Sequence, residues 1–305
     1  GASTKNAGFS CFGSISELLD DIKNMGVDAC MEVVRMRWLG LQKLQSRVGL
    51  SSLEYNPCGG TELFRSTDDE LRDACLEGMD RCNTLMKTYL GLDQCYTKKQ
   101  NTKLKGFDDI SIFNQYEGII NPVSMMNTLI QKAIQLGVQI LNGINITRID
   151  QENHILIADQ NLKIDYHNLI ICTNGFATGL LPDLPVFPAR NQVLMTKPLE
   201  KLTLNSGFHV DKGYIYFRQY KGRILLGGGR NMDEKTETTA EFGNTLFIQQ
   251  YLINILETIY PGASDHIDHW WSGILGVGPS KYPIIQWIDE NVLAGVRLGG
   301  MGVAI

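Results

Sequence analysis

The sequence predicts a mixed α/β (α+β) chain in which a helical region precedes a larger, sheet-rich part. Apolar residues recur at helical spacing through much of the first ~120 residues. After residue 118, short apolar runs bounded by glycine, proline and asparagine take over, which is typical of strands. The 305 residues are 43% hydrophobic and 20% charged. This is ordinary globular composition, and the length favours roughly two domains.

Two long helices are predicted in the first part. The first has its apolar stripe at Val34, Trp38, Leu41, Leu44 and Val48, and Gly49 is a plausible C-terminal stop. The second begins at Thr67, because Glu70 follows at capping-box spacing. Its stripe consists of Leu71, Cys75, Met79, Cys82, Leu85 and Tyr89.

A third helix opens the next part of the chain. Asn121 can cap it, Pro122 suits its first position and Gly137 ends it. Four short strands are then expected, at 138–141, 144–149, 154–158 and 169–172. A helix followed by strands that end in Cys172-Thr173-Asn174-Gly175 predicts part of an α/β nucleotide-binding layer.

The second half is predicted to be mainly strand. Prolines 182, 185 and 188 mark a crossing point, and a helix with one apolar face is expected from Thr245 to Ile259. The predicted strands are 192–196, 214–218, 223–226, 270–272, 284–285 and 292–294.

Charge and composition exclude several classes of protein. A net charge of −5 and a pI near 5.6 argue against nucleic acid or an anionic membrane surface as the main partner. No apolar run approaches the roughly 20 residues of a membrane span, and the opening residues lack a secretory signal. The seven cysteines form no CxxC pair, which favours reduced thiols in a cytoplasmic protein.

Neither a metal centre nor a serine-hydrolase site is predicted. His266 and His269 have a spacing that would suit two ligands on a helix. However, Trp270 and Trp271 favour a strand, which would point the two histidines to opposite faces. The chain also contains no GxSxG elbow.

Two glycine-rich segments are the candidate binding elements. The first is Gly1 to Phe9 (GASTKNAGF), and the second is Leu298 to Ala304 (LGGMGVA), which follows a predicted strand. Taken alone, each can be an ordinary loop or turn. Glycines after a strand also leave N–H groups unpaired, which favours negative charge beyond the strand end. Such an edge suits the N1–C2 carbonyl side of a reduced flavin.

The order of the motifs resembles the D-amino-acid oxidase superfamily of FAD enzymes, which includes glycine oxidase, sarcosine oxidase and gamma-glutamylputrescine oxidase-like proteins. The similar stretches cover nearly the whole chain: GASTKNAGF (1–9), GIINPVSMMNTL (118–129), LIICTNGFAT (169–178), FPARNQVL (187–194), GYIYFRQYKGRILLGGG (213–229), WWSGILGVGPSKYPII (270–285) and NVLAGVRLGGMGVAI (291–305).

The resemblance implies a fold and a division into domains. An incomplete, discontinuous, Rossmann-like FAD-binding domain would comprise residues 1–14, 118–185 and 290–305. A mostly helical region would span 15–117, and a substrate-binding domain with a large mixed or antiparallel sheet would span 186–289. The family's GxGxxG loop has no match here, so we expect a chain without that N-terminal segment. An exposed sheet edge would then make a homodimer plausible.

The resemblance also implies FAD, bound without a covalent link because the segment that carries the flavin-linked cysteine in sarcosine oxidase has none here. The expected cofactor residues are Ser3, Thr4, Lys5, Asn6, Ala7, Thr173, Asn174, Gly175, Gly299, Gly300, Met301 and Gly302.

The expected catalytic residues are Tyr214, Tyr216 and Arg218. The two tyrosines lie on one face of a strand, which is either the substrate pocket or core. The family's carboxylate-binding arginine is replaced by Leu275. Arg218 and Arg297 can substitute for it or be structural.

The implied reaction is oxidation of a C–N bond in an amine or amino acid. A hydride passes to flavin N5, and water hydrolyses the resulting imine. Two alternatives stay open. One is a flavin dehydrogenase of a 2-hydroxy acid. The other is a truncated, flavin-free domain without activity.

Overall fold

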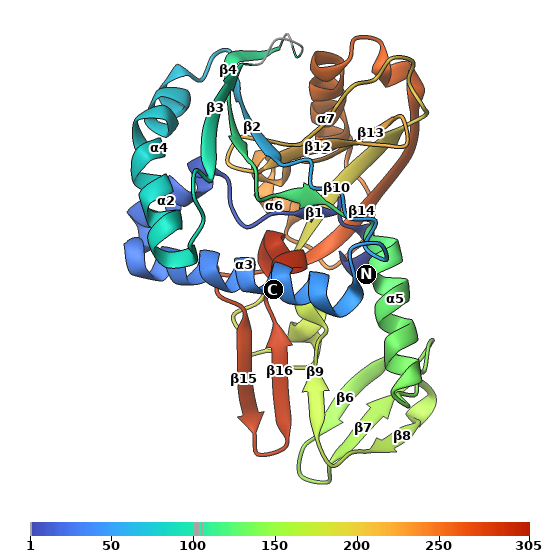
Figure 1. Ribbon diagram of the computed structural model, residues 1–305. Helices are drawn as coiled ribbons and strands as arrows, with labels where there is room; N and C mark the ends of the chain where they lie inside the picture. The colour runs from blue at the N-terminus through green and yellow to red at the C-terminus, as the bar shows by residue number, and fades with distance from the viewer. Residues whose placement is uncertain (1, 101–103, 105) are drawn as a thin grey trace.

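The computed structural model describes residues 2–100, 104 and 106–305 (Figure 1). The α-helices are α1 (Ala2–Lys5), α2 (Ile15–Met25), α3 (Val27–Val48), α4 (Asp69–Leu90), α5 (Pro122–Gln135), α6 (Glu234–Glu237) and α7 (Leu246–Ile259). Short 3₁₀ helices are η1 (Asp159–Asn161), η2 (Asn174–Gly179), η3 (Arg230–Met232), η4 (Ala263–His266) and η5 (Gly299–Ala304).

In the part of the chain that the structure describes, the strands fall into four sheets. The first eight are β1 (Phe9–Ser10), β2 (Gly60–Arg65), β3 (Tyr96–Gln100), β4 (Phe107–Asn114), β5 (Gly118–Ile119), β6 (Ile146–Asp150), β7 (Ile155–Ala158) and β8 (Lys163–Asp165). The others are β9 (Leu169–Ile171), β10 (Phe187–Thr196), β11 (Gly207–Val210), β12 (Ile215–Tyr220), β13 (Arg223–Gly228), β14 (Ile267–Val277), β15 (Ile284–Asp289) and β16 (Val292–Val296).

The largest sheet organises the fold. Within the described residues its strand order is β14-β10-β13-β12-β11-β2-β4-β3. Its neighbours are antiparallel except β11 and β2, which run parallel, so the predicted large mixed sheet is confirmed. Alternate residues point to opposite faces. One face packs α7 over Leu194, Phe217 and Leu226, which are fully buried.

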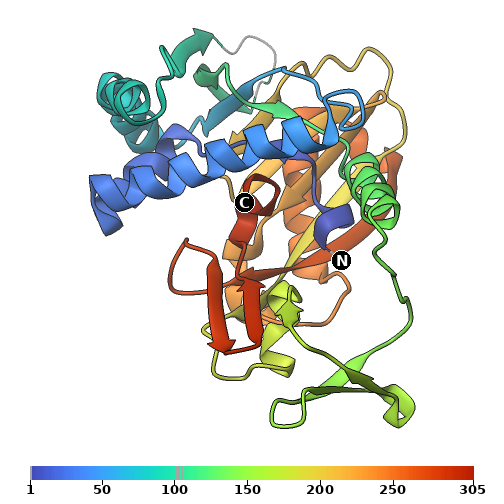
Figure 2. The same ribbon diagram turned by 60° about the horizontal axis from the view of Figure 1, so that its bottom comes forward.

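The other end of the sheet is covered by α2, α3 and α4 (Figures 1 and 2). The region 15–117 contains these expected helices. It also supplies β2, β3 and β4, which the sequence patterns did not predict. Because β2 pairs with β11, this region and residues 186–289 share one sheet. The division between them therefore remains an interpretation of the sequence.

The predicted helix boundaries are largely confirmed, with one correction. Asn121 accepts hydrogen bonds from the amides of Val123 and Ser124, which caps α5 as expected. Gly49 ends α3, also as expected. Helix α4 begins at Asp69 rather than at Thr67. The amide of Asp68 bonds the carbonyl of Arg65 in a turn, so Thr67 lies inside that turn.

Two smaller sheets lie on the far side of α3 (Figure 1). Strand β16 lies between β15 and β9 and runs parallel to β9, and β6, β7 and β8 form an antiparallel meander. The expected strand at 138–141 was wrong: these residues have no regular structure. Val138 and Leu141 are exposed, and no described strand pairs with them.

Described helices long and apolar enough to cross a membrane are absent. The mixed α/β fold class predicted from the sequence is confirmed by this architecture. Both ends of the described chain lie near the middle of the molecule, between the large sheet and the smaller ones (Figure 2). This convergence builds the candidate site.

Candidate active site

A cavity of about 450 Å³ lies between the large sheet, the N-terminal segment and the C-terminal turn. This volume is within the range of small-molecule sites. Its walls come from β10, β12 and β14, from residues 5–9, from η5 and from the start of α2. Asn6 and Gly300 both line it. The structure therefore brings the two glycine-rich segments of the sequence together at one site.

The sheet behind the cavity carries one row of residues that lie opposite one another on neighbouring strands, and Val193, Tyr216 and His209 of this row line the cavity. The pairing aligns them in one row across β14, β10, β13, β12, β11 and β2: Trp271, Val193, Gly227, Tyr216, His209 and Glu62. Side chains opposite one another share a face of the sheet. A Cβ on Gly227 would lie 2.7 Å from the Tyr216 ring, so the glycine makes room for the tyrosine.

Both predicted substrate-side tyrosines line the cavity. Tyr214 lies just before β12 and is 41% exposed. The hydroxyl of Tyr216 accepts a hydrogen bond of 3.3 Å from Nδ2 of Asn191 on β10, and burial raises the pKa of Tyr216. The Oδ1 atom of Asn191 is buried and has no hydrogen-bond partner among the described residues. An acceptor in this position suits a ligand N–H or O–H group.

The N-terminal segment forms a short helix, α1, where a loop was expected; Gly1 lies outside the described residues. Asn6 closes this helix: its Nδ2 bonds the carbonyls of Ala2 and Ser3, and its Oδ1 accepts from the amide of Gly8. Trp271 Nε1 donates to the carbonyl of Lys5 at 2.8 Å, which anchors α1 to the sheet. Lys5, Asn6 and Ala7 line the cavity, whereas Ser3 and Thr4 lie outside it and are exposed.

The C-terminal turn forms the opposite wall. Gly299, Gly300 and Met301 line the cavity, and Gly302 does not. An added Cβ at Gly299 or Gly300 would meet no atom within 4 Å, so the glycines leave open space along this edge. The amide of Leu298 donates to Asn174 Oδ1 at 3.1 Å, which fixes the start of the turn.

The predicted residues Thr173, Asn174 and Gly175 lie outside the cavity. A Cβ on Gly175 would collide with the carbonyl of Leu275, so the glycine lets η2 pack closely on β14. Together with the bond from Asn174 to Leu298, this packing supports the wall from behind. A direct contact of these residues with a cofactor stays a prediction.

Arg218 does not line the cavity, although we expected it at the catalytic centre. It is 4% exposed, and its guanidinium donates to the carbonyls of Ala7 at 2.5 Å and Ile120 at 3.2 Å. Burial lowers the pKa of Arg218 to about 10. The guanidinium is held by hydrogen bonds to backbone carbonyls, one of them in the segment that follows α1. We therefore interpret Arg218 as a positioning residue.

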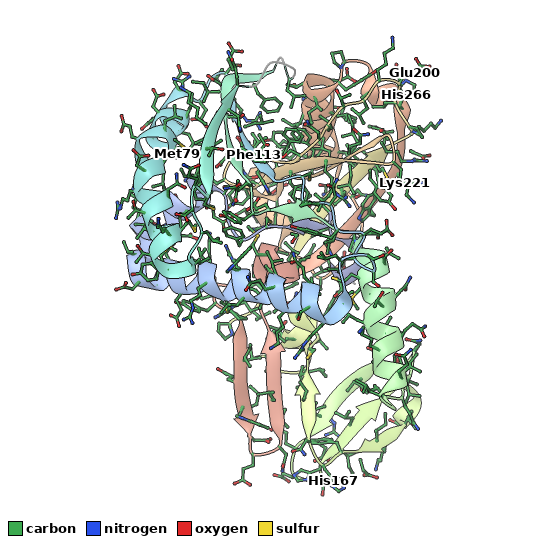
Figure 3. The ribbon with its side chains drawn as sticks, viewed as in Figure 1. Met79, Phe113, His167, Glu200, Lys221 and His266 are labelled. Atoms are coloured by element: carbon green, nitrogen blue, oxygen red, sulfur yellow. The ribbon has the colours of Figure 1, made fainter. Side chains whose placement is uncertain are left out.

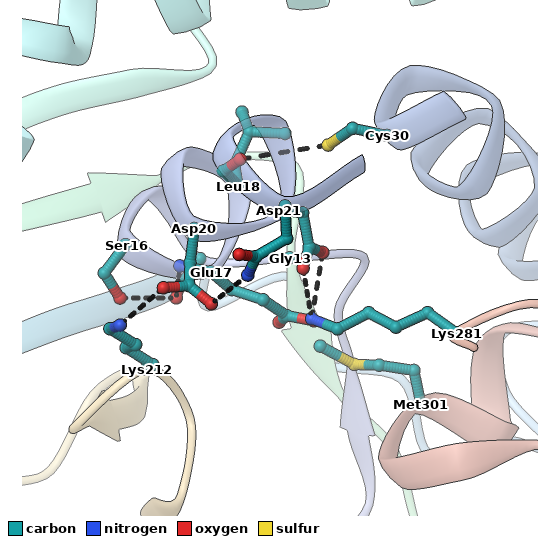
Figure 4. A network of polar contacts seen from close by, with 12 residues as sticks. Gly13, Ser16, Glu17, Leu18, Asp20, Asp21, Cys30, Lys212, Lys281 and Met301 are labelled. Carbon is teal, nitrogen blue, oxygen red and sulfur yellow. Dashed lines mark hydrogen bonds and ion pairs between the residues drawn. The ribbon is translucent and has the colours of Figure 1, made fainter. Parts of the chain in front are cut away.

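A network of ion pairs closes one rim of the cavity, and sequence reasoning missed it (Figure 4). Lys281 lies 2.9 Å from Glu17 and 2.7 Å from Asp21, and Arg37 lies 3.1 Å from Glu17. Burial opposes ionisation of Glu17, but Arg37 and Lys281 outweigh it and lower its pKa. Lys281 thereby ties the segment after β14 to α2. Its position in a loop gave no periodic signal.

The remaining sequence candidates are the histidines considered as metal ligands and Arg297. His266 is at the outer edge of the molecule, on the same side as Glu200 and Lys221 (Figure 3). No group of three or more His, Cys, Asp or Glu side chains in the described residues could hold a metal ion. Arg297 lines the cavity, but its guanidinium donates to the carbonyls of Tyr282 and Pro185.

Comparisons with known proteins give the family. Among solved structures, the chain is similar to iminodiacetate oxidase from Chelativorans sp. BNC1 (17% identity, TM-score 0.73, 99% of this chain and 82% of that chain). It is also similar to glycine oxidase from Geobacillus kaustophilus (16% identity, TM-score 0.72, 100% of this chain and 81% of that chain). A third similar structure is L-α-glycerophosphate oxidase from Mycoplasma pneumoniae with FAD bound (14% identity, TM-score 0.69, 99% of this chain and 82% of that chain).

At these identities the likeness shows the fold alone. No curated protein matches the chain in sequence. A family model does: the one described as DAO, FAD dependent oxidoreductase, matches residues 1–305. With the match over its whole length and a cavity where its two glycine-rich segments meet, the chain belongs to the DAO family of FAD-dependent oxidoreductases.

Proposed function

We propose that this oxidoreductase binds FAD non-covalently in the cavity and oxidises the C–N bond of an amine or amino acid. The observation that carries the proposal is Asn191 Oδ1, a buried acceptor without a described partner on the substrate-facing sheet. A primary amine can donate to this oxygen and still present its C–H bond to the centre of the cavity. Tyr214 and Tyr216 flank that position and would orient the substrate.

The residues of the cavity fit a flavin. The glycines at 299 and 300 leave room for a flat ring edge, and Lys5, Asn6 and Ala7 lie across the cavity from them. These residues, with Met301, would hold the cofactor. When bound, FAD supplies the two-electron acceptor for the carbon that carries the nitrogen.

A thiol also lines the cavity, which bears on how the flavin would be attached. Cys11 is 6% exposed, and its Sγ lies 3.4 Å from Sδ of Met301. Burial raises the pKa of the Cys11 thiol well above its ordinary range, and Glu117 raises it further. A thiol that stays protonated is a poor nucleophile. This supports a non-covalent cofactor.

The chain's own groups would bind and orient the substrate. Leu275 gives the wall an apolar side chain where the family resemblance implies an arginine. We therefore propose that the amine is recognised through Asn191 and through the aromatic wall rather than through a bidentate carboxylate clamp at position 275.

The test is reduction of bound FAD under anaerobic conditions. The FAD-loaded protein is mixed with glycine, iminodiacetate, lactate or α-glycerophosphate, and the loss of flavin absorbance is followed. Bleaching by the amines, and a rate at least tenfold lower in Asn191→Ala than in the wild type, is the expected result. Thr61→Ala, at a position on β2 that does not line the cavity, is the matched control and should reduce normally.

A second candidate has its own support, because one similar structure is an α-glycerophosphate oxidase. Reduction by lactate or α-glycerophosphate, with the amines inert, would replace the amine proposal with oxidation of a hydroxyl-bearing carbon. A protein that takes up no FAD would refute both candidates.

A further inference from the structure

His209 lies in the wall between two polar spaces. It occupies the middle of β11, is 7% exposed and lines the main cavity. On the cavity side its ring lies 5.0 Å from the ring of Phe9. On the other side it borders a small void of about 10 Å³. No element of the proposed function uses this imidazole.

Two buried carboxylates accompany His209 from different parts of the chain. Oε2 of Glu117, from the turn between β4 and β5, lies 3.4 Å from Nε2 of His209. Glu62 occupies the paired position on β2. It accepts hydrogen bonds from the Ser16 amide and hydroxyl and from the Ser14 hydroxyl. Glu117 and Glu62 are 2% and 3% exposed. A cluster of one imidazole and two carboxylates can bind an additional proton.

The void between these groups is the size of one water molecule and is lined largely by polar side chains. Ser14, Asn114, Glu62, Glu117 and His209 all border it. Two of their atoms, Asn114 Nδ2 and His209 Nε2, are buried without a hydrogen bond in the described structure. Buried polar atoms of this kind usually bond to ordered water. One water here would connect His209 with both carboxylates.

We propose that His209, Glu117, Glu62 and one water in this void form a proton relay behind the cavity wall, which removes a proton from the substrate ammonium. This inference rests on the proposed oxidation of an amine. An amine must be neutral before its C–H bond is oxidised, and in neutral solution it is mostly an ammonium ion. The relay supplies the acceptor for that proton inside the closed site.

The transfer balances without a further reactant. His209 and Asn191 line different parts of the same cavity, and the substrate passes His209 before it binds at Asn191. At His209 an ammonium N–H bond breaks, its electron pair stays on the amine nitrogen, and an N–H bond forms at Nδ1 of the neutral imidazole. The Nε2 proton of the resulting imidazolium then passes through the water to a carboxylate. No group is oxidised or reduced in this step. The proton stays in the protein until it exchanges with solvent after the product leaves.

The charges around His209 support this role. Glu117 faces it from the β4–β5 turn, Glu62 from β2, Tyr216 from β12 and Glu17 from α2. Burial opposes protonation of His209, but Glu117 outweighs burial, and the pKa of His209 is raised. Burial raises the pKa of Glu62, although Ser16 and His209 partly offset it. The raised pKa of His209 and the raised pKa of Glu62 both favour uptake of a proton by the cluster.

The first experiment measures the cluster directly. Imidazole ¹⁵N NMR of the FAD-loaded protein follows the histidine signals with pH, and His209→Asn identifies the signal. We expect His209 to titrate at higher pH than a histidine in a model peptide, and Glu117→Gln to lower the pKa of His209. A His209 signal that titrates at the ordinary histidine pKa and does not respond to Glu117→Gln overturns the relay.

The second experiment asks whether the cluster takes the substrate's proton. Glycine or iminodiacetate reduces the bound FAD over a range of pH in the wild type, His209→Asn and His269→Asn. We expect His209→Asn to be about 10²-fold slower at neutral pH. The defect should shrink at alkaline pH, where free amine is already abundant. His269→Asn should follow the wild type.

The outcomes separate the relay from the proposed function. A His209→Asn defect of the same size at every pH indicates a structural role and overturns the relay. If no amine reduces FAD in the wild type, the proposed amine substrate fails and the ammonium as proton source fails with it. The NMR titration would then still decide whether the buried cluster holds an additional proton.

Discussion

Replacement of Arg218 by Met tests whether this buried side chain positions residues 7–10 beside the cavity or simply stabilises the fold. Arg218→Met keeps the length of the apolar stem and removes the guanidinium. The carbonyls of Ala7 and Ile120 then lose their donors. Two buried carbonyls without partners cost about 2–6 kcal/mol in total, at about 1–3 kcal/mol each.

An opposing effect makes the net change small. Burial lowers the pKa of Arg218 from 12.5 to about 10. A difference of this size corresponds to about 3 kcal/mol by which the folded protein disfavours the charge at neutral pH. Arg218→Met relieves that cost. The free energy of unfolding should therefore fall by about 1 kcal/mol, less than the ~2–5 kcal/mol expected for truncation of the fully buried Leu226 to Ala.

The local effect should be larger than the global one. Arg218 links Ala7 to Ile120 next to the cavity, so its loss frees residues 7–10 without opening the sheet. If about 2 kcal/mol of local stability is lost, amide exchange in this segment accelerates about 30-fold. Hydrogen exchange with mass spectrometry and urea denaturation measure the two quantities. A global loss above about 4 kcal/mol, or unchanged exchange at residues 7–10, would refute the positioning role.

Three further predictions concern the cavity and its surroundings. Gly300→Ala should leave the unfolding free energy within about 0.5 kcal/mol, since its Cβ meets no atom within 4 Å, yet weaken FAD binding at least tenfold in a fluorescence titration. Gly228→Ala should destabilise the fold by more than about 2 kcal/mol in thermal melts, because φ is 117° and the Cβ would collide with the carbonyl of Tyr214. Glu237→Gln should cost about 3–5 kcal/mol at neutral pH, because it leaves buried Arg190 unpaired. Burial opposes ionisation of Glu237, but Arg190 outweighs it and lowers the pKa. The wild type's added stability should therefore be present above about pH 4.5 and disappear as pH falls further, and denaturation at several pH values would show this slope vanish in Glu237→Gln.

Local signals explain which elements could be predicted from the sequence. Helix α5 carries its own cap and first-turn proline, Asn121 and Pro122, so its start needs no tertiary information. Strand β3 has no such signal. It is an edge strand whose Lys98 and Lys99 face solvent, so it lacks the alternation that marks a half-buried strand. Its pairing with β4 becomes visible only in the folded sheet.

The residues of the candidate site also differ in whether a local sequence signal marks them. The glycine-rich segments were found because each is a continuous motif. Asn191 and His209 come from β10 and β11, which β13 and β12 separate, and the register of these strands places both residues on the face that lines the cavity. Glu117 comes from a turn and lies beside His209. Asn191 precedes the predicted strand 192–196 by one residue. It is two residues from Val193 and shares its face only because β10 begins earlier than predicted, at Phe187. Nothing local indicated Glu117.

The convergence of the two chain segments on one cavity depends on a glycine that carries no functional motif. Gly40 lies in the middle of α3, where glycine costs about 1 kcal/mol relative to alanine. A Cβ at this position would collide with the carbonyl of Ala304 in η5. The missing side chain therefore lets the C-terminal turn seat against α3, with Ala304 buried in the same core as Phe12, the residue that follows the N-terminal wall of the cavity. Gly40 lowers the helix propensity of α3, and in return it allows the close contact that holds Gly300 and Met301 opposite Asn6. In this fold the packing of η5 against α3 sets the shape of the cavity, and this packing also determines where the polar groups of the cavity lie.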